Sequence, residues 1–254
     1  MKLSIVTLTF NNFDELRYTR LSIPENYPEV ESVIVNGGRC QKTEKFLHEN
    51  HQGTFISDPD KGISDGFNKG IALASGKYVM LLNSGDILLE PSYLDYAISY
   101  LDQNPEIAFC HADIYFLHPE KGRVYHKPKG RFPGMPYNHQ GMVVRKSVYE
   151  QVGGFSLEYR FTMDLDWVCR ATALGMKGHY YPKAVVEMDG NGVSTTQEGL
   201  SMIEAMKVSL KNKSIGGLSG FVELSIVILK IYTKRFLVRL GLYKINKPEI
   251  NTLE

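Results

Sequence analysis

Polar side chains gather directly after three apolar runs in the first third of the chain. Residues 9–12 (Thr-Phe-Asn-Asn), 36–38 (Asn-Gly-Gly) and 83–86 (Asn-Ser-Gly-Asp) each follow a short run rich in Val, Ile and Leu. In an open α/β sheet, ligands bind beyond the carboxyl ends of the strands, so we expect these three segments to meet at one site. Their hydroxyl, amide and carboxylate groups suit a nucleotide diphosphate.

The sequence lacks the common phosphate-binding signatures. No Gly-x-Gly-x-x-Gly follows the first apolar run, and no Gly-x4-Gly-Lys-Ser/Thr occurs anywhere. This argues against a Rossmann dehydrogenase and a P-loop enzyme. The usual alternative is a divalent cation, Mn²⁺ or Mg²⁺, held on a strand-end carboxylate beside the diphosphate.

The elements that must position these segments alternate between strand and helix patterns, which predicts an α/β fold with a mostly parallel sheet. Apolar, β-branched runs predict strands at 3–9, 33–35, 54–56, 77–82 and 107–116. Helical patterns cover 14–21, 43–50, 64–74, 91–103, 147–153 and 165–174, and residues 121–142 have the composition of a loop with short strands. No linker interrupts residues 1–210, so we expect one domain there and a separate tail at 211–254.

The charge is distributed unevenly along a chain of 254 residues and net charge +1. Residues 207–247 hold nine of the 29 Lys and Arg but one acidic residue, Glu223, which leaves 20 basic and 27 acidic residues elsewhere. A mildly acidic body argues against nucleic-acid binding. The basic tail favours contact with anionic lipid.

The cysteines and the start of the chain indicate a cytoplasmic protein. Cys40, Cys110 and Cys169 are widely spaced and odd in number, which predicts free thiols in a reducing compartment without a zinc site. The chain enters an apolar strand at Leu3, a pattern unlike a signal peptide.

Seven motifs follow one another in the first 200 residues: segments 4–7 (SIVT), 33–38 (VIVNGG), 57–70 (SDPDKGISDGFNKG), 83–86 (NSGD), 153–155 (GGF), 164–166 (DLD) and 192–195 (GVST). In this order they resemble the family 2 glycosyltransferases with a GT-A fold, and among them the colanic-acid and exopolysaccharide type. This resemblance implies a Rossmann-like, mostly parallel sheet flanked by helices, with a helical tail after it.

The resemblance also implies roles for individual residues. Asp86 would bind the divalent metal and Asp164 would be the catalytic base. The donor-binding set would be Thr7, Thr9 and Asn36 around the base and ribose, with Asp60, Asp65, Asn68, Lys69 and Asn83 against the rest of the donor. Two departures stand out: the family usually has Asp where Asn36 stands, and its Asp-x-Asp motif is reduced here to the single carboxylate of Asp86.

Each of these residues also has a simpler structural interpretation. Asp86 could close a turn or cap the helix near residue 91, and Asp60 and Asp65 could be solvated loop or N-cap residues. Asp166 is expected to pair with Arg170 at i+4, which leaves Asp164 free to act as the base. Low-ranked acceptor or loop candidates are His139, Asp166 and Ser194, the last in a loop at 191–194 that could close over the donor.

The tail is apolar and basic but is not predicted to span a membrane. Its longest uncharged apolar run lies between Glu223 and Lys230, whereas a spanning helix needs about 20 residues. We expect peripheral contact with the inner face of the plasma membrane. The alternative is a helix packed on the catalytic domain or on a second copy in a homodimer.

Together these observations predict an inverting glycosyltransferase of cell-surface polysaccharide biosynthesis. It would move a sugar from a nucleotide-diphosphate donor, UDP-linked in the first instance, to a hydroxyl of a glycan or lipid-linked acceptor. The alternatives are a catalytically weak protein that only binds sugar nucleotides, and a nucleotidyltransferase, which would release pyrophosphate.

Overall fold

The computed structural model describes residues 1–242 except 25–26, 28, 131–133, 215 and 241. Strands and helices alternate through the first half as the sequence predicts. This half contains β1 (Leu3–Thr9), α1 (Phe13–Ser22), β2 (Val30–Asn36), α2 (Gln41–Glu49), β3 (Thr54–Ser57), α3 (Ile63–Leu73), β4 (Tyr78–Asn83), β5 (Ile87–Leu88) and α4 (Ser92–Gln103). The second half contains β6 (Ile107–His118), β7 (Gly122–His126), a 3₁₀ turn (His139–Gly141), β8 (Val143–Arg145), α5 (Lys146–Val152), α6 (Met163–Ala173), β9 (Lys177–Asp189), α7 (Val193–Thr196), α8 (Glu198–Lys211) and α9 (Gly217–Arg239).

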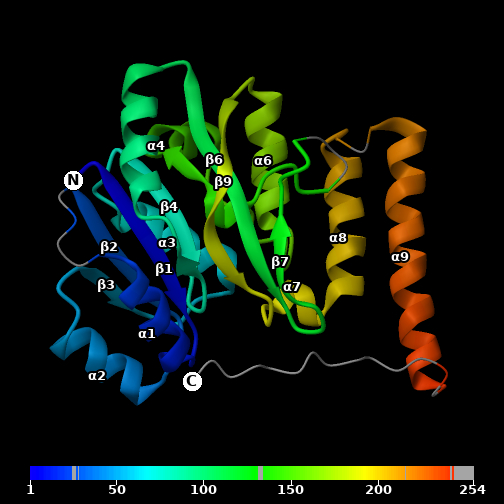
Figure 1. Cartoon of the computed structure of the whole chain (residues 1–254), viewed down its shortest axis with the longest axis horizontal. Coiled ribbons are helices and arrows are strands. Elements are labelled where there is room, and N and C mark those ends of the chain that lie inside the picture. Colours follow the sequence, from blue (N-terminus) through cyan, green and yellow to red (C-terminus); the bar gives the residue numbers. More distant parts are fainter. Residues whose placement is uncertain (25–26, 28, 131–133, 215, 241, 243–254) are drawn as a thin grey trace.

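One mixed sheet of nine strands forms the centre of the molecule (Figure 1). Its order is β3-β2-β1-β4-β8-β6-β9-β5, with β7 paired to β6 outside this path. The strands β3, β2, β1 and β4 run parallel, and β6 runs parallel to β9. All seven residues of β1 are buried, which is expected for a parallel strand covered on both faces. The parallel first half places the carboxyl ends of β1, β2 and β4 at one edge, as the sequence predicts.

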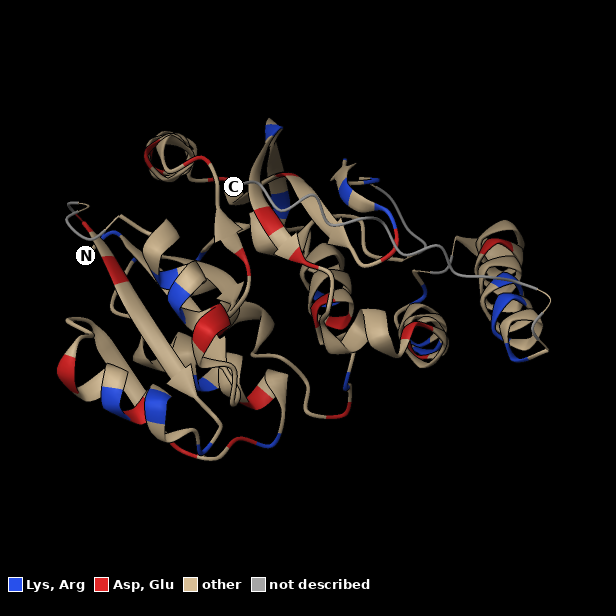
Figure 2. Ribbon diagram, turned by 60° about the horizontal axis from the view of Figure 1, so that its bottom comes forward, with Lys and Arg blue, Asp and Glu red and all other residues tan. Residues whose placement is uncertain are grey.

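The two long C-terminal helices differ in how they contact the rest of the molecule. Helix α8 packs on α6 through Leu165, Cys169, Ala205 and Val208, so it belongs to the body. Helix α9 stands beyond α8 at the edge of the molecule and carries several Lys and Arg (Figures 1 and 2). Within the described part of the chain, no helix is long and apolar enough to cross a membrane.

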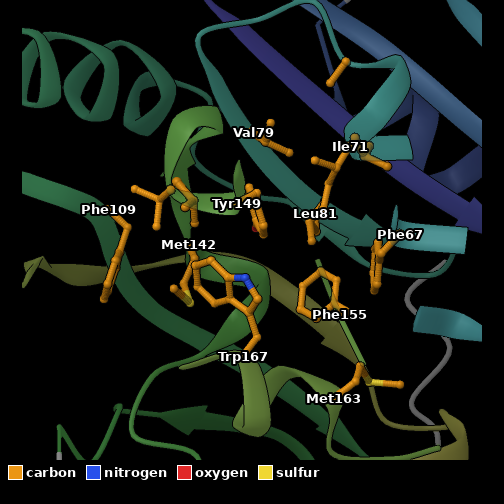
Figure 3. Close-up of a cluster of buried hydrophobic side chains, with 14 of the residues drawn as sticks. Phe67, Ile71, Val79, Leu81, Phe109, Met142, Tyr149, Phe155, Met163 and Trp167 are labelled. Carbon is orange, nitrogen blue, oxygen red and sulfur yellow. The ribbon is translucent and has the colours of Figure 1, made fainter. Parts of the chain in front are cut away.

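Two apolar cores cover the two faces of the sheet. Side chains alternate along β4, so Val79 and Leu81 join one core while Tyr78, Met80 and Leu82 join the other. The first core is rich in aromatic side chains, and Figure 3 shows Trp167 of α6 packed between Tyr149 and Phe155. The indole N–H of Trp167 donates to the Gly153 carbonyl at 3.0 Å, which satisfies its one polar group. This core packs against α6 and thereby holds the first turn of that helix in position.

Candidate active site

The carboxyl ends of β1 and β4 line a cavity of about 830 Å³, here named the strand-end cavity. Thr9 donates to the Asn12 side chain at 2.8 Å, and Asn12 donates to the Ser84 hydroxyl at 2.6 Å. These two bonds fasten the segment after β1 to the segment after β4. Asn83 and Asp86 from the second segment also line the cavity. Two of the three polar segments singled out in the sequence thus form one wall.

Asp86 lies buried at the base of this cavity. One carboxylate oxygen accepts the Asn83 N–H at 2.9 Å and the other accepts the Asp189 N–H at 3.1 Å. Burial raises the pKa of Asp86 to about 7, and the neighbouring Asp189 carboxylate contributes in the same direction. The predicted turn-closing role is therefore present, because the side chain does bond across the turn at residues 83–86.

A second carboxylate, Asp189, lines the same cavity and is absent from the sequence-based candidates. It is the last residue of β9, and a Cβ added to Gly85 would lie 3.1 Å from its side chain. The absence of a side chain at Gly85 lets the two acidic segments approach. No sequence pattern links Asp86 with Asp189, since the two are 103 residues apart and meet only through the pairing of β5 with β9.

A divalent cation fits this pair of carboxylates. Among the residues that the structure describes, no group of three or more His, Cys, Asp or Glu is arranged to hold a metal. Mg²⁺ and Mn²⁺ at nucleotide sites commonly take one or two protein carboxylates and complete their shell with phosphate oxygens and water. The raised pKa of Asp86 beside Asp189 marks a place where positive charge would be stabilising. Each Asp86 oxygen accepts one backbone bond and has a further lone pair to offer.

The loop between β3 and α3 forms another wall through Asp60, whose carboxylate accepts the Gly62 N–H at 2.9 Å. Gly62 has φ +115°, a conformation that side chains disfavour, and this allows the tight entry into α3. Lys69 pairs with Asp58 at 2.6 Å and Asp65 at 3.4 Å, and Asp65 accepts the Lys61 N–H. Asp65 and Lys69 therefore stabilise the loop that carries Asp60.

Five of the predicted donor-binding residues are not among the described residues that line the strand-end cavity: Thr7, Asn36, Asp65, Asn68 and Lys69. Asn36 is fully buried and bonds Glu44, Ser57 and the Gly38 N–H. Asn68 exchanges two bonds with the backbone of Phe155, at 2.9 and 2.8 Å. These side chains organise the site in the free protein, and their contact with donor stays a prediction.

Asp164 and His139 form an interacting, half-buried pair that lines the strand-end cavity. Asp164 is in the first turn of α6 and accepts the Leu165 N–H at 2.8 Å. Burial raises the pKa of Asp164 and lowers that of His139, while the charge of each opposes the shift of the other. The rings of Phe67 and Phe155 meet His139 edge-on, and its Nε2 has no hydrogen-bond partner among the described residues.

The expected ion pair between Asp166 and Arg170 is confirmed. Asp166 is buried and accepts from Arg170 Nε at 2.9 Å, with Asn212 beside its other oxygen at 3.3 Å. Asp164 has no such cationic partner in the described chain. A carboxylate with a raised pKa and no permanent ion pair is suited to accept a proton.

A second cavity of about 1200 Å³ lies between the body and α9, and we name it the α9 cavity. The two cavities share six lining residues: His139, Gln140, Asp164, Met188, Asn191 and Ser194. Ser194 is in the short helix α7, where the sequence predicted a loop. Asp164 thus lines both the strand-end cavity and the α9 cavity.

The comparisons with known proteins agree with this geometry. The family model described as Glycosyl transferase family 2 matches residues 4–163. An uncharacterized glycosyltransferase of Mycobacterium tuberculosis is 26% identical over 204 residues, or 77% of this chain and 78% of that protein. The poly-beta-1,6-N-acetyl-D-glucosamine synthase of Staphylococcus epidermidis is 28% identical over 110 residues, which cover 41% of this chain and 26% of the synthase.

Two solved structures show the same fold at low sequence identity. S. aureus TarS 1–349 in complex with UDP-GlcNAc has a TM-score of 0.62 at 15% identity, covering 94% of this chain and 73% of that one. The mannosyltransferase PcManGT from Pyrobaculum calidifontis, solved with GDP-Man and Mn²⁺, has a TM-score of 0.65 at 12% identity. This second match covers 96% of this chain and 81% of the mannosyltransferase.

Proposed function

Because the chain belongs to glycosyl transferase family 2 and adopts the GT-A fold, we propose that it transfers a sugar from a UDP-linked donor to an acceptor hydroxyl with inversion. One observation carries the proposal. Asp164, a carboxylate with a raised pKa, lies where the strand-end cavity meets the α9 cavity. The donor occupies the first cavity and the acceptor the second, so the reacting atoms meet at Asp164.

The donor diphosphate lies toward Asp86 and Asp189. Asp86 and Asp189 would hold Mn²⁺ or Mg²⁺, which would supply positive charge against the leaving diphosphate. Thr9, Asn83 and Asp60 line the same cavity and contribute hydroxyl, amide and carboxylate groups to the rest of the donor. The two donors seen in the structural neighbours, UDP-GlcNAc and GDP-Man, are both nucleotide diphosphate sugars, which supports this class of donor.

Transfer is a direct displacement at the anomeric carbon. The acceptor oxygen forms a bond to that carbon as the bond to the diphosphate oxygen breaks, and the acceptor proton passes to the Asp164 carboxylate. Attack from the face opposite the leaving group inverts the anomeric configuration. Burial that raises the pKa of Asp164 makes it a stronger base at the moment of transfer. Ser194 and Asn191 line both cavities, so the segment at 191–194 is placed to exclude water from the bound donor.

The outer face of α9 is proposed to lie on an anionic membrane surface. Leu218, Val222, Leu229, Phe236 and Leu240 recur at three- and four-residue spacing or its multiples, and Leu218 and Leu229 are 81% and 67% exposed. An apolar stripe of this kind with cations beside it is typical of helices at a lipid interface. This would place the enzyme on the inner face of the plasma membrane, in contact with a glycan or lipid-linked acceptor. Pairing of two α9 helices in a homodimer is the competing explanation.

A comparison of Asp164→Asn with Asp166→Asn tests the proposal. The chain is incubated with UDP-GlcNAc, UDP-Glc and UDP-Gal, Mn²⁺ and a lipid extract as acceptor, and UDP and pyrophosphate are measured separately. We expect Asp164→Asn to bind UDP normally and lose about 10²- to 10⁴-fold in transfer, because the amide cannot accept the proton. Asp166→Asn, which alters a neighbouring ion pair, serves as the matched control.

Other outcomes contradict the proposal in distinct ways. Release of pyrophosphate would indicate a nucleotidyltransferase, and donor binding without any turnover would indicate a protein that only binds sugar nucleotides. If Asp166→Asn stops transfer while Asp164→Asn remains active, the base is Asp166 and not Asp164.

A further inference from the structure

One wall of the α9 cavity is a single face of α9. Its lining residues on this helix are Lys230, Ile231, Lys234, Arg235, Val238 and Arg239. Ile231 and Val238 are two turns apart and lie in the middle of this face, with Lys230 and Lys234 on one side and Arg235 and Arg239 on the other. The cavity therefore has a narrow apolar strip flanked by two rows of cationic side chains.

Most of this positive charge has no ion-pair partner among the residues that the structure describes. Lys234 pairs with Glu120 at 2.8 Å. By contrast, Lys230, Arg235 and Arg239 form no ion pair with any residue in the described ranges. Lys121 adds a further cation to the lining, whereas its carboxylates are Glu120, Asp164 and Glu198.

The cations of α9 lie beside the cavity, and the helix is apolar on two sides. Leu224, on the same side of the helix as Ile231, is buried, whereas Leu229, Phe236 and Leu240 on the outward side are 67%, 60% and 55% exposed. The cations lie between these two apolar sides and line the cavity, where an anionic ligand would neutralise them.

We propose that the α9 cavity binds the acceptor through a phosphate group on Arg235 and Arg239, which are neighbours at i and i+4 on one side of the helix. Arginine donates two parallel N–H bonds to phosphate oxygens, and two neighbouring arginines offset the charge of a phosphate monoester or diester. The saccharide or alcohol end of the acceptor then extends toward Asp164, which lines the same cavity. This inference rests on the proposed function for the role of Asp164, and it adds that the acceptor is a phosphate-bearing compound.

Equilibrium binding separates this inference from the proposed function. The full chain is first saturated with UDP and Mn²⁺, so that a phosphate probe cannot enter the strand-end cavity. Glucose 1-phosphate and monomeric decyl phosphate are then titrated by calorimetry, with glucose and decyl maltoside as neutral counterparts. Glucose 1-phosphate represents a soluble source of phosphate, and decyl phosphate represents a lipid-linked source.

We expect at least one phosphate probe to saturate while its neutral counterpart binds at least tenfold more weakly. The double variant Arg235→Gln/Arg239→Gln is expected to weaken the phosphate probe about tenfold or more, since it removes charge-assisted bonds. Arg235→Lys/Arg239→Lys is expected to restore part of the loss. Lys207→Gln is the matched control, because Lys207 is an exposed lysine of the neighbouring helix α8 outside the cavity.

The outcomes are distinguishable. Tighter binding of decyl phosphate assigns the phosphate to a lipid-linked acceptor, and equal or tighter binding of glucose 1-phosphate assigns it to a soluble one. The inference is overturned if neither phosphate probe binds, if the neutral compounds bind equally well, or if Lys207→Gln weakens binding as much as the double variant. UDP affinity in the same samples reports the donor site, so failure of the proposed function would appear there. The single variant Arg239→Gln provides the same comparison if the double variant does not fold.

Discussion

The strand-end cavity and the α9 cavity meet at one carboxylate but are built in opposite ways. The first is formed at the tips of parallel strands, where polar side chains bond one another, as Thr9 does to Asn12 and Asn12 to Ser84. In the second, the wall opposite the body is one helix whose cations Arg235 and Arg239 have no ion pair in the described chain.

This difference matches what each cavity is proposed to do. A diphosphate and a metal require carboxylates held in fixed positions, and the sheet supplies them because strand ends are tied together through the backbone. Recognition of an acceptor depends on long side chains that can adapt to the ligand. Substitutions in the strand-end cavity should therefore affect catalysis strongly, whereas those on α9 should act on affinity.

The largest effect is expected at the paired carboxylates of the strand-end cavity. Asp189→Asn and Asp86→Ala should each lower Mn²⁺-dependent UDP affinity by about a hundredfold or more, because a carboxylate ligand is lost. Calorimetry with and without Mn²⁺ measures this. Asp86→Ala should in addition reduce the free energy of unfolding by about 1–3 kcal/mol, since two backbone N–H groups lose their acceptor. If UDP affinity depends on Mn²⁺ as strongly in both variants as in the parent chain, the metal does not bind at Asp86 and Asp189.

The second expected effect concerns the junction of the cavities, and it is a pH dependence. Transfer requires Asp164 without its proton, and burial raises the pKa of Asp164 above the ordinary aspartate value. Activity should therefore fall as pH decreases through the raised pKa, by about tenfold per pH unit below it, with the midpoint above about pH 4. Single-turnover rates at saturating donor measure this limb, and UDP affinity over the same range is the control. A midpoint at or below pH 4 would contradict the assignment.

A smaller effect is expected on the outer face of α9. Leu229→Ser and Phe236→Ser should each weaken binding to phosphatidylglycerol vesicles by about tenfold, because each removes a large apolar side chain from the lipid contact. Vesicle co-sedimentation measures the change, and UDP affinity should stay the same. If the parent chain binds no vesicles and both variants convert a dimer into a monomer in light scattering, the outer face is a protein interface.

The smallest effect on ligand binding is expected at Asn68, whose side chain forms two hydrogen bonds with the backbone of Phe155. Asn68→Ala should reduce the free energy of unfolding by about 1–3 kcal/mol, because the Phe155 N–H and C=O lose their partners. Thermal unfolding measures the loss. Lys69→Ala at the adjacent position should cost less, since its ion pairs lie at the surface. A large loss of UDP affinity in Asn68→Ala would instead support the predicted donor contact.

Local sequence pattern was sufficient for the first half of the molecule. The runs that predict β1 to β4 are continuous and β-branched, and parallel strands buried on both faces produce such runs. The pairing of Asp166 with Arg170 was also predictable, because i and i+4 residues of a helix are neighbours whatever surrounds them. The order of the motifs identified the family and the edge of the sheet where its ligand would lie.

Only the tertiary structure decided how those residues are used. Asn36 and Asn68 carry the motif, but neighbours distant in sequence, such as Ser57 and Phe155, already accept their hydrogen bonds. Asp189 joins Asp86 through the pairing of β5 with β9, and the cations of α9 line a cavity because that helix packs beside α8. Sequence pattern determines the conformation of adjacent residues through local sterics and periodicity. Which side chains converge on one carboxylate depends on long-range packing, and packing has no local period in the chain.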